Sequence, residues 1–283
     1  MINSGEIKQI ARNKLAGNWG KAIAISAIYI AIVYALSYCS TLIENVTLNT
    51  PILNDAAKII FTIILLPLSF GFISTMIKLL NGKNPAYTTV INDSILNASK
   101  AVGIFFRTLL KILFPAIIVI LAAVAIVYLT TQYFPVSWDT LFGYLLFLAF
   151  LYVVCGIIIA IVSLPYSLAT YALANNNELT SKEAIDQSVS LMEGNKWNFV
   201  KLMLSFIGWF ILIALAVGII TNYAPSMFED LTEAVASILI LPYIIASISV
   251  FYDELNDVKV EFVKTEEQDE VKEETPAEEK TEE

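Results

Sequence analysis

Histidine is absent from this chain of 283 residues, and only two cysteines occur. Histidine is the commonest general base and a frequent metal ligand, so its absence removes the most ordinary routes to acid–base catalysis and to a zinc site. Cys39 and Cys155 both lie in apolar runs, where we expect buried free thiols and no disulfide. Walker A and Gly-x-Gly-x-x-Gly sequences are missing too. We therefore predict no catalytic, cofactor-binding or metal-binding residue, no enzymatic activity and no nucleic-acid partner.

Charged residues are scarce and unevenly placed. They make up 15% of the chain, against roughly 25% in soluble domains, while 57% of the chain is hydrophobic. The formal charge of −9 comes from residues 253–283, which contain 14 acidic and 4 basic side chains. No aromatic residue follows Phe262, so this end has little to bury. Residues 256–283 are predicted to form an acidic, disordered cytoplasmic tail, which either aids solubility or docks a basic partner.

Six uncharged runs are long enough to cross the hydrocarbon core of a bilayer as helices, which takes about 18–20 residues. They cover residues 22–43, 59–77, 112–138, 140–177, 202–228 and 234–252. In lipid each segment has to satisfy its own backbone hydrogen bonds, so helices are predicted and not strands. The expected fold is all-α, a polytopic transmembrane helix bundle of six spans in residues 1–255.

Lysine and arginine lie almost entirely on one side of these spans. Sixteen of the 17 precede the first span, lie in the second or fourth connection, or follow the last span, and only Lys58 lies on the other side. Cytoplasmic loops of membrane proteins are enriched in basic residues. We therefore expect a multi-pass protein of the bacterial cytoplasmic membrane with both termini in the cytoplasm.

A Leu-Pro pair recurs in the second, fourth and sixth predicted spans. The prolines are Pro67, Pro165 and Pro242, and the residue four positions later is small each time: Gly71, Ala169 or Ala246. An asparagine, Asn97 or Asn195, lies 30 positions after each of the first two prolines. A proline favours a helix kink, and a small residue allows close helix approach. The spacing predicts three copies of one unit: a cytoplasmic helix, a span, a short outer loop and a kinked span.

Two cytoplasmic helices have readable patterns. Thr180 and Glu183 fit a capping box, and apolar residues then recur on one face of the segment that follows. Near the amino terminus, apolar residues such as Ile7 and Leu15 share one face, and Lys8, Arg12 and Lys14 lie on the other. A basic amphipathic helix beside a span is suited to the lipid headgroup layer, and packing beneath the bundle is the equal alternative.

Glycine, asparagine and tryptophan form short motifs near the starts of the odd-numbered spans. These motifs are Gly17-Asn18-Trp19, Gly194-Asn195-Lys196-Trp197 and Gly208-Trp209. Trp19 and Trp197 are placed as interfacial anchors are. Trp209 falls inside the fifth span, where we expect its indole to be packed.

Together with Leu241-Pro242-Tyr243 and Phe251-Tyr252-Asp253, these motifs closely resemble bacterial integral membrane proteins of domain-of-unknown-function family 975. The resemblance covers about residues 5 to 255. The family is distantly similar to the membrane domain attached to some glycerophosphodiester phosphodiesterases. That likeness implies no activity here, and the family supplies no catalytic residue to transfer.

Two functional hypotheses lead; an intramembrane enzyme is a third, and it would need a water-accessible cluster of polar side chains that the sequence does not show. The first is a non-enzymatic bundle that organises or senses its membrane, or binds a protein partner through the cytoplasmic helices or the acidic tail; its expected partners include membrane lipids. The alternative is a transporter or flippase for a neutral or lipid-linked substrate, with a cavity between Pro-kinked spans. Charged residues are absent from the span centres, which disfavours a proton-coupled pump.

Overall fold

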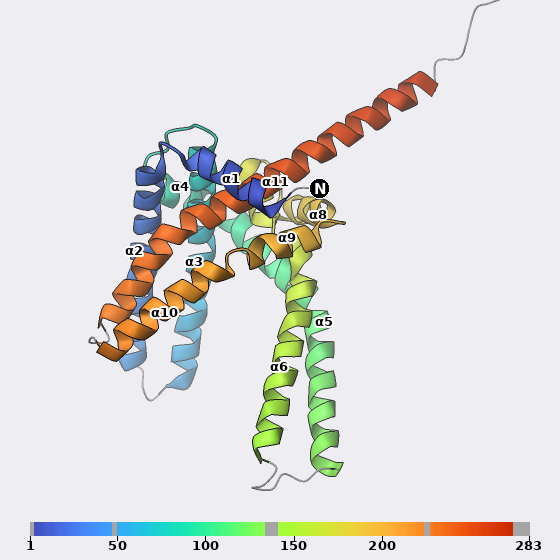
Figure 1. Cartoon of the computed structure of the whole chain (residues 1–283). Helices are drawn as coiled ribbons and strands as arrows, with labels where there is room; N and C mark the ends of the chain where they lie inside the picture. The colour runs from blue at the N-terminus through green and yellow to red at the C-terminus, as the bar shows by residue number, and fades with distance from the viewer. Residues whose placement is uncertain (1–2, 47–49, 134–140, 224–226, 274–283) are drawn as a thin grey trace, which may run out of the picture.

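The computed structural model describes residues 3–46, 50–133, 141–223 and 227–273. Within these residues every regular element is a helix (Figure 1). The elements are α1 (Ser4–Leu15), α2 (Trp19–Val46), α3 (Pro51–Leu80), α4 (Thr89–Leu96), α5 (Ala98–Tyr133), α6 (Leu141–Ser163), a 3₁₀ turn η1 (Leu164–Tyr166), α7 (Ala169–Asn175), α8 (Ser181–Met192), α9 (Lys196–Leu204), α10 (Ile207–Tyr223) and α11 (Met227–Glu273).

Six helical segments are long and apolar enough to cross a membrane. They are Trp19–Glu44, Ile52–Leu80, Ala98–Tyr133, Phe142–Asn175, Lys196–Ile220 and Asp230–Val258. The predicted all-α, multi-pass bundle is therefore confirmed. The third segment begins 14 residues before the predicted start at residue 112, because the basic residues that interrupt the apolar run do not end the helix. The ammonium of one of them, Lys111, lies 3.7 Å from a carboxylate oxygen of Asp186 in α8.

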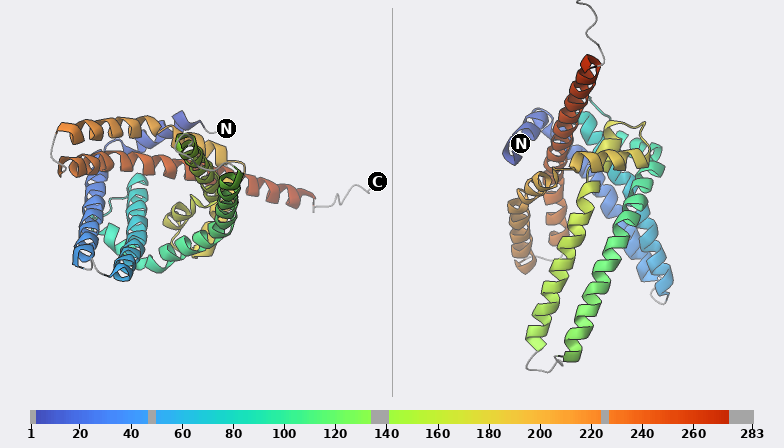
Figure 2. Two further views of the ribbon diagram at one scale, coloured as in Figure 1. Left: turned by 90° about the horizontal axis from the view of Figure 1, so that it is seen from below. Right: turned by 90° about the vertical axis from the view of Figure 1, so that its right-hand side faces the viewer.

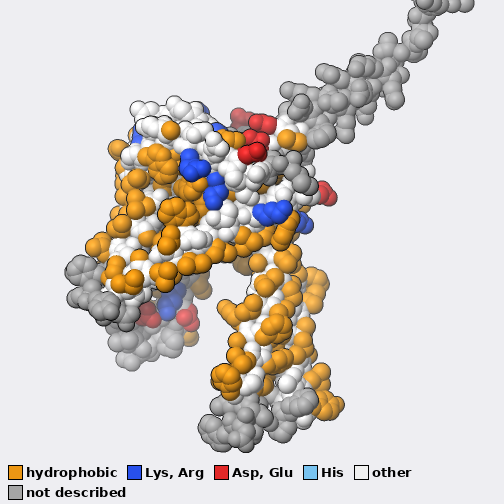
Figure 3. All heavy atoms as spheres, in the orientation of Figure 1, with side chains coloured by type: hydrophobic (Ala, Val, Ile, Leu, Met, Phe, Trp, Pro, Cys, Tyr) orange, Lys and Arg blue, Asp and Glu red, His pale blue; other side chains and the backbone are white. Residues whose placement is uncertain are grey.

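The spans form three antiparallel hairpins that meet at one end of the molecule. α2 pairs with α3, α5 with α6, and α10 with α11, and seen from below the hairpins stand on three sides of the bundle (Figure 2). The shorter helices α1, α4, α7 and α8 gather at the end opposite the hairpin tips, which we call the core end (Figure 1). Towards the tips, the α5/α6 hairpin stands apart from the rest of the molecule (Figure 3).

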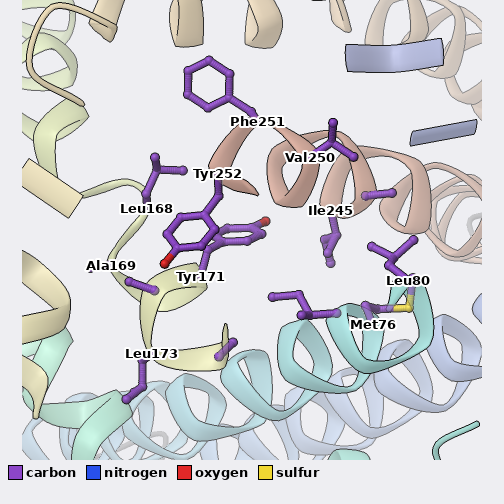
Figure 4. Close-up of a cluster of buried hydrophobic side chains, with 14 of the residues drawn as sticks. Met76, Leu80, Leu168, Ala169, Tyr171, Leu173, Ile245, Val250, Phe251 and Tyr252 are labelled. Carbon is purple, nitrogen blue, oxygen red and sulfur yellow. The ribbon is translucent and has the colours of Figure 1, made fainter. Parts of the chain in front are cut away.

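The packed core lies at the core end and is built largely from the segments that follow the three Leu-Pro pairs. Side chains of α3, α7 and α11 converge there (Figure 4). The fully buried members include Phe70, Met76, Leu173 and Phe251. Each Leu-Pro pair therefore marks the level at which a span passes from an apolar exterior into a protein interior.

The three prolines do not act alike. Pro67 and Pro242 lie inside the continuous helices α3 and α11. At Pro165 the expectation of a kink within one helix is wrong, because the helix stops at Ser163 and a 3₁₀ turn follows. Ser188 of α8 makes this break possible: its hydroxyl donates to the Pro165 carbonyl at 2.7 Å and accepts from the Leu168 amide at 3.1 Å.

α3 and α4 pack at very short range around Gly71. A Cβ at this position would lie 2.1 Å from both the Val90 carbonyl oxygen and the Ser94 hydroxyl, so only glycine fits. Asp93, which is only 6% exposed, anchors the same pair of helices. Its carboxylate accepts from the Lys78 ammonium at 2.6 and 2.8 Å and from the Ser74 hydroxyl at 2.7 Å.

Three asparagines each connect a short helix to the span that follows, and their backbone carbonyls make the same hydrogen bond. The carbonyls of Asn18, Asn97 and Asn195 each accept from the amide four residues later, at 2.9 to 3.1 Å. The side chains of Asn97 and Asn195 each donate to the carbonyl four residues earlier. Gly17 and Gly194 precede two of them with φ near +81° and +73°, which glycine adopts without strain.

The two helices predicted to be cytoplasmic, α1 and α8, pack on the bundle. The capping box of α8 is confirmed, with the Glu183 amide donating to the Thr180 hydroxyl and the Thr180 amide donating to the Glu183 carboxylate. Ile185 and Met192 of its predicted apolar face are buried, while Val189 is exposed. These buried faces favour packing beneath the bundle over a position in the lipid headgroup layer.

Two further expectations concern the cysteines and the tail. Both cysteines are free, but neither is fully buried: Cys39 is exposed and Cys155 is partly buried. The expectation of burial is therefore wrong, because the segments of α2 and α6 that carry them have few protein neighbours. α11 extends to Glu273, and residues 274–283 lie outside the described part of the chain. The division into a bundle ending at residue 255 and a disordered tail from 256 stays a prediction.

Candidate functional site

A groove of about 800 Å³ runs between α10 and α11 beneath α1. α1 contributes Gly5, Lys8 and Arg12 to its mouth, and Trp19 lies beside them at the start of α2. In the space-filling view, basic side chains gather above the hydrophobic surface of the spans at this end (Figure 3). The groove therefore joins positive charge at the core end to an apolar channel along two spans.

The helical repeat of α1 explains which side chains reach the groove. Ile7, Ala11 and Leu15 are four residues apart and fully buried, and α1 packs against α11. Lys8 and Arg12, each one position further along, are offset by about 100° and so share the adjacent face. Burial of the apolar stripe thus turns both cations towards the groove.

Lys8 is held at the mouth by contacts with the break between α9 and α10. Its ammonium donates to the Ser205 carbonyl at 3.0 Å and lies 4.8 Å from the centre of the Phe206 ring. The helix is interrupted at Ser205, which leaves that carbonyl free of a helical partner. Burial and, to a lesser extent, the neighbouring charge of Arg12 lower the pKa of Lys8.

Arg12 is exposed. Among the described residues, neither Arg12 nor Lys8 has an ion-pair partner. Lys14, two residues further along α1, is different, because it pairs with Asp253 of α11 at 2.9 Å. Two like charges four residues apart on a helix repel each other modestly. The mouth of the groove therefore carries positive charge that the described part of the chain does not neutralise.

The walls of the groove are apolar and follow one face of each span. α10 contributes Trp209, Leu212, Ile213 and Ala216, and α11 contributes Thr232, Ala236, Leu239, Ile240 and Tyr243. Ala216 and Ala236 line the groove with small side chains, one from each helix. From Tyr243 to Thr232 the channel is about 16 Å long at 1.5 Å per residue, close to half of the ~30 Å hydrocarbon thickness. The groove is thus about one leaflet deep.

Two of the motif tryptophans meet in this groove although they lie far apart in the sequence. Trp19 starts α2, and Trp209 lies in the first turn of α10. The expectation that Trp209 is packed is wrong, since 51% of its surface is exposed along the groove. The break at Ser205 separates α9 from α10, so Trp209 lies in the first turn of α10 and not in the middle of a continuous helix.

The other motif positions lie elsewhere. Gly17 and Asn18 form the α1–α2 junction, Gly194 and Asn195 form the α8–α9 junction, and Gly208 precedes Trp209 with open space around it. Pro67, Pro165, Pro242 and Trp197 do not line the groove. Trp197 is 63% exposed, with the Lys201 ammonium 5.9 Å from its ring. The sequence motifs therefore mark helix junctions more than a common site.

The sequence predicts Lys8 and Arg12 only as part of a basic helix face and does not indicate the walls of the groove. The four-residue spacing of the two cations is one available signal. The small residues at positions 216 and 236, in the fifth and sixth predicted spans, are a second. Neither signal could show that α1 would lie over α10 and α11.

A second, polar cavity of about 420 Å³ opens at the core end. It is lined by Lys14, Asn81, Asn175, Asn176, Gln187, Tyr252, Asp253, Asn256 and Asp257. Asn81 and Asn176 follow the ends of α3 and α7, and Gln187 donates to both the Tyr252 hydroxyl and the Asn256 side chain. The cavity therefore lies where the ends of several spans meet.

Comparison with known proteins returns one family. Residues 1–259 match the model of a family described as "Protein of unknown function (DUF975)". No curated protein and no solved structure matches the chain. The distant likeness to the membrane domain of glycerophosphodiester phosphodiesterases stays a prediction.

Proposed function

Since the chain belongs to the DUF975 family of proteins of unknown function, its role has to be inferred from its own geometry, and we propose that it is a non-enzymatic, lipid-binding protein that organises or senses its membrane. The groove of α1, α10 and α11 is its lipid site. Among the described residues no cluster of three or more His, Cys, Asp or Glu could hold a metal ion. This sets no limit on chemistry of other kinds, and the proposal rests on the groove alone.

One observation carries the proposal: Lys8 and Arg12, unpaired among the described residues, lie over an apolar channel about one leaflet deep. A membrane lipid has the matching form, a polar head at the interface and an acyl chain in hydrocarbon. Tryptophan side chains favour the headgroup level, and Trp19 and Trp209 line the groove near its mouth.

The proposed orientation puts the core end and both termini in the cytoplasm of a bacterial cell. It is supported by the basic residues, because 16 of the 17 lie on one side of the six uncharged runs of the sequence. Lys58 and Glu44, which pair at 3.1 Å near the tip of the α2/α3 hairpin, would then face the outside.

We also propose that the bundle is a threefold internal repeat. Support comes from the asparagine junctions, which use their backbone carbonyls alike, and from the buried small residues Gly71, Ala169 and Ala246 at the same distance from their prolines. The hairpins are then three copies of one unit, joined at the core end.

Filling the groove tests the lipid site. Ala236→Trp places a bulky ring in the channel, whereas Ala122→Leu adds volume to the exposed face of α5. Native mass spectrometry of the full chain, released from bilayers into mild detergent, should find at least one tightly held phospholipid in the wild type and in Ala122→Leu, and less in Ala236→Trp. The proposal fails if the wild type and Ala236→Trp retain lipid equally.

The polar cavity supports the alternative of a transporter or flippase for a neutral or lipid-linked substrate. Its amide side chains can bind hydroxyl or amide groups of a solute where the spans end. Reconstituted vesicles provide the test, with a fluorescent phospholipid and a panel of neutral solutes. Transport above protein-free vesicles favours this alternative, and its absence across the panel contradicts it.

A further inference from the structure

We propose that the groove of α1, α10 and α11 is selective for an anionic phospholipid, whose phosphate is bound by Arg12 and Lys8. This inference rests on the proposed lipid-binding function and names the ligand class. The acyl chain of the same lipid occupies the channel between α10 and α11.

The charge balance at the mouth is the first support. The residues that line the groove include two cations and no aspartate or glutamate. Lys14 on the same helix pairs with Asp253, whereas Lys8 and Arg12 have no ion-pair partner among the described residues. Glu6, the acidic residue of α1, does not line the groove. A headgroup with net negative charge would compensate it, whereas a zwitterionic headgroup would bring its own cation into a site without a carboxylate.

The donor geometry is the second support. The planar guanidinium of Arg12 can bind two phosphate oxygens at once, and such bidentate contacts are among the stronger hydrogen bonds in proteins. The Lys8 ammonium has three N–H donors, and its one hydrogen bond within the described chain goes to the Ser205 carbonyl. That bond keeps the ammonium at the mouth and leaves donors for a second contact with the ligand.

The apolar channel is the third support, because it distinguishes a lipid from a free phosphate. Leu212, Ile213, Leu239 and Ile240 form a wall with little to offer a small anion. An acyl chain buries apolar surface along it, which is favourable when that surface is removed from water. In a membrane this free-energy gain is smaller, because the acyl chain exchanges one apolar surrounding for another. The channel therefore positions the lipid, and the cations select it.

The experiment compares lipids and variants on the full-length protein. Phosphatidylglycerol or phosphatidylcholine is titrated into delipidated protein in neutral detergent, and bound lipid is measured by native mass spectrometry. The variants are Arg12→Gln, Lys8→Gln and Ala236→Trp. Lys182→Gln removes an exposed charge from α8, outside the groove, and is the matched control. Thermal unfolding of each variant shows whether it is folded.

The wild type and Lys182→Gln should prefer phosphatidylglycerol. Arg12→Gln should weaken its binding about tenfold or more, as expected for the loss of hydrogen bonds to a charged group. It should weaken phosphatidylcholine binding less, because that headgroup carries a phosphate but also brings its own cation. Lys8→Gln should act in the same direction. Inorganic phosphate should compete poorly with the lipid.

Three results would overturn the inference in different ways. Equal binding of the two lipids by the wild type, lost in Ala236→Trp, shows a lipid site without charge selection, so the proposed function stands and this inference fails. Competition by inorganic phosphate as strong as by the lipid, with no effect of Ala236→Trp, shows a phosphate site. Lipid binding that Ala236→Trp does not reduce removes the groove from both proposals.

Discussion

At the scale of single residues, the molecule depends on a few positions where one side chain decides whether two helices can meet. Gly71 is the clearest of them, because the backbone carbonyl of Val90 occupies the space where a Cβ would be. Backbone atoms of a neighbouring helix cannot rotate away, so relief would require the helices to separate. Glycines elsewhere in the spans, such as Gly156 in α6, have open space around them.

Gly71→Ala is therefore expected to destabilise the protein by about 1–3 kcal/mol, the usual cost of overpacking. Thermal unfolding in detergent should show a lower midpoint for this variant than for the wild type. Gly156→Ala is the control: its added methyl meets no atom, so its midpoint should not fall. Equal midpoints for the two variants would show that α4 does not pack on α3 at this distance.

At the scale of helices, residues close in the sequence determine where a helix begins and ends, whereas contacts with other helices determine where a helix is interrupted. The capping box of α8 depends on two residues three positions apart, and the sequence predicted it correctly. The break at Pro165 depends on Ser188, and the position of Lys8 depends on Ser205, which is 197 residues away. Spans could be predicted from the distribution of charge; the groove could not, because it requires contacts between distant segments.

The capping box makes the start of α8 sensitive to acid. Hydrogen bonds from the Thr180 backbone and then its hydroxyl hold the pKa of Glu183 below its ordinary value. A carboxylate with a lowered folded-state pKa stabilises the fold above the unfolded value of about 4.3, and this stabilisation disappears as the pH falls through the folded value. Hydrogen-exchange protection of the first turn of α8 should therefore fall on acidification below about pH 4.3.

Glu183→Gln provides the comparison, because a glutamine keeps the shape but cannot be protonated in this range. Its protection factors in the first turn of α8 should stay constant over the same acidification. Parallel profiles for the wild type and the variant would mean that Glu183 does not contribute through its charge.

At the scale of the whole molecule, the arrangement of basic residues and the clustering of the short helices at the core end agree with a single orientation. Asn84 of the α3–α4 connection accepts a hydrogen bond from Lys21, and Lys100 donates to the Asn177 carbonyl, so the connections at this end contact the starts of neighbouring spans. Such contacts require the connections between hairpins to share one side of the membrane.

Single cysteines introduced as Lys83→Cys, Lys182→Cys and Asp55→Cys test this orientation, in a background with Cys39→Ser and Cys155→Ala. A membrane-impermeant maleimide should label position 55 in right-side-out vesicles and positions 83 and 182 in inverted ones. Labelling of all three positions from the same side would contradict the six-span topology. Labelling with the sides exchanged would contradict the proposed cytoplasmic location of the termini.

The location of the core at one end also affects how the protein responds to bilayer thickness. The most apolar windows of the α5/α6 hairpin contain no buried residue, so in the far leaflet hydrocarbon surrounds this hairpin on most sides. Helices relieve a mismatch with the bilayer chiefly by tilting. Thickening or thinning of the far leaflet can thus change the inclination of one hairpin while the packed core at the opposite end of the molecule keeps its geometry.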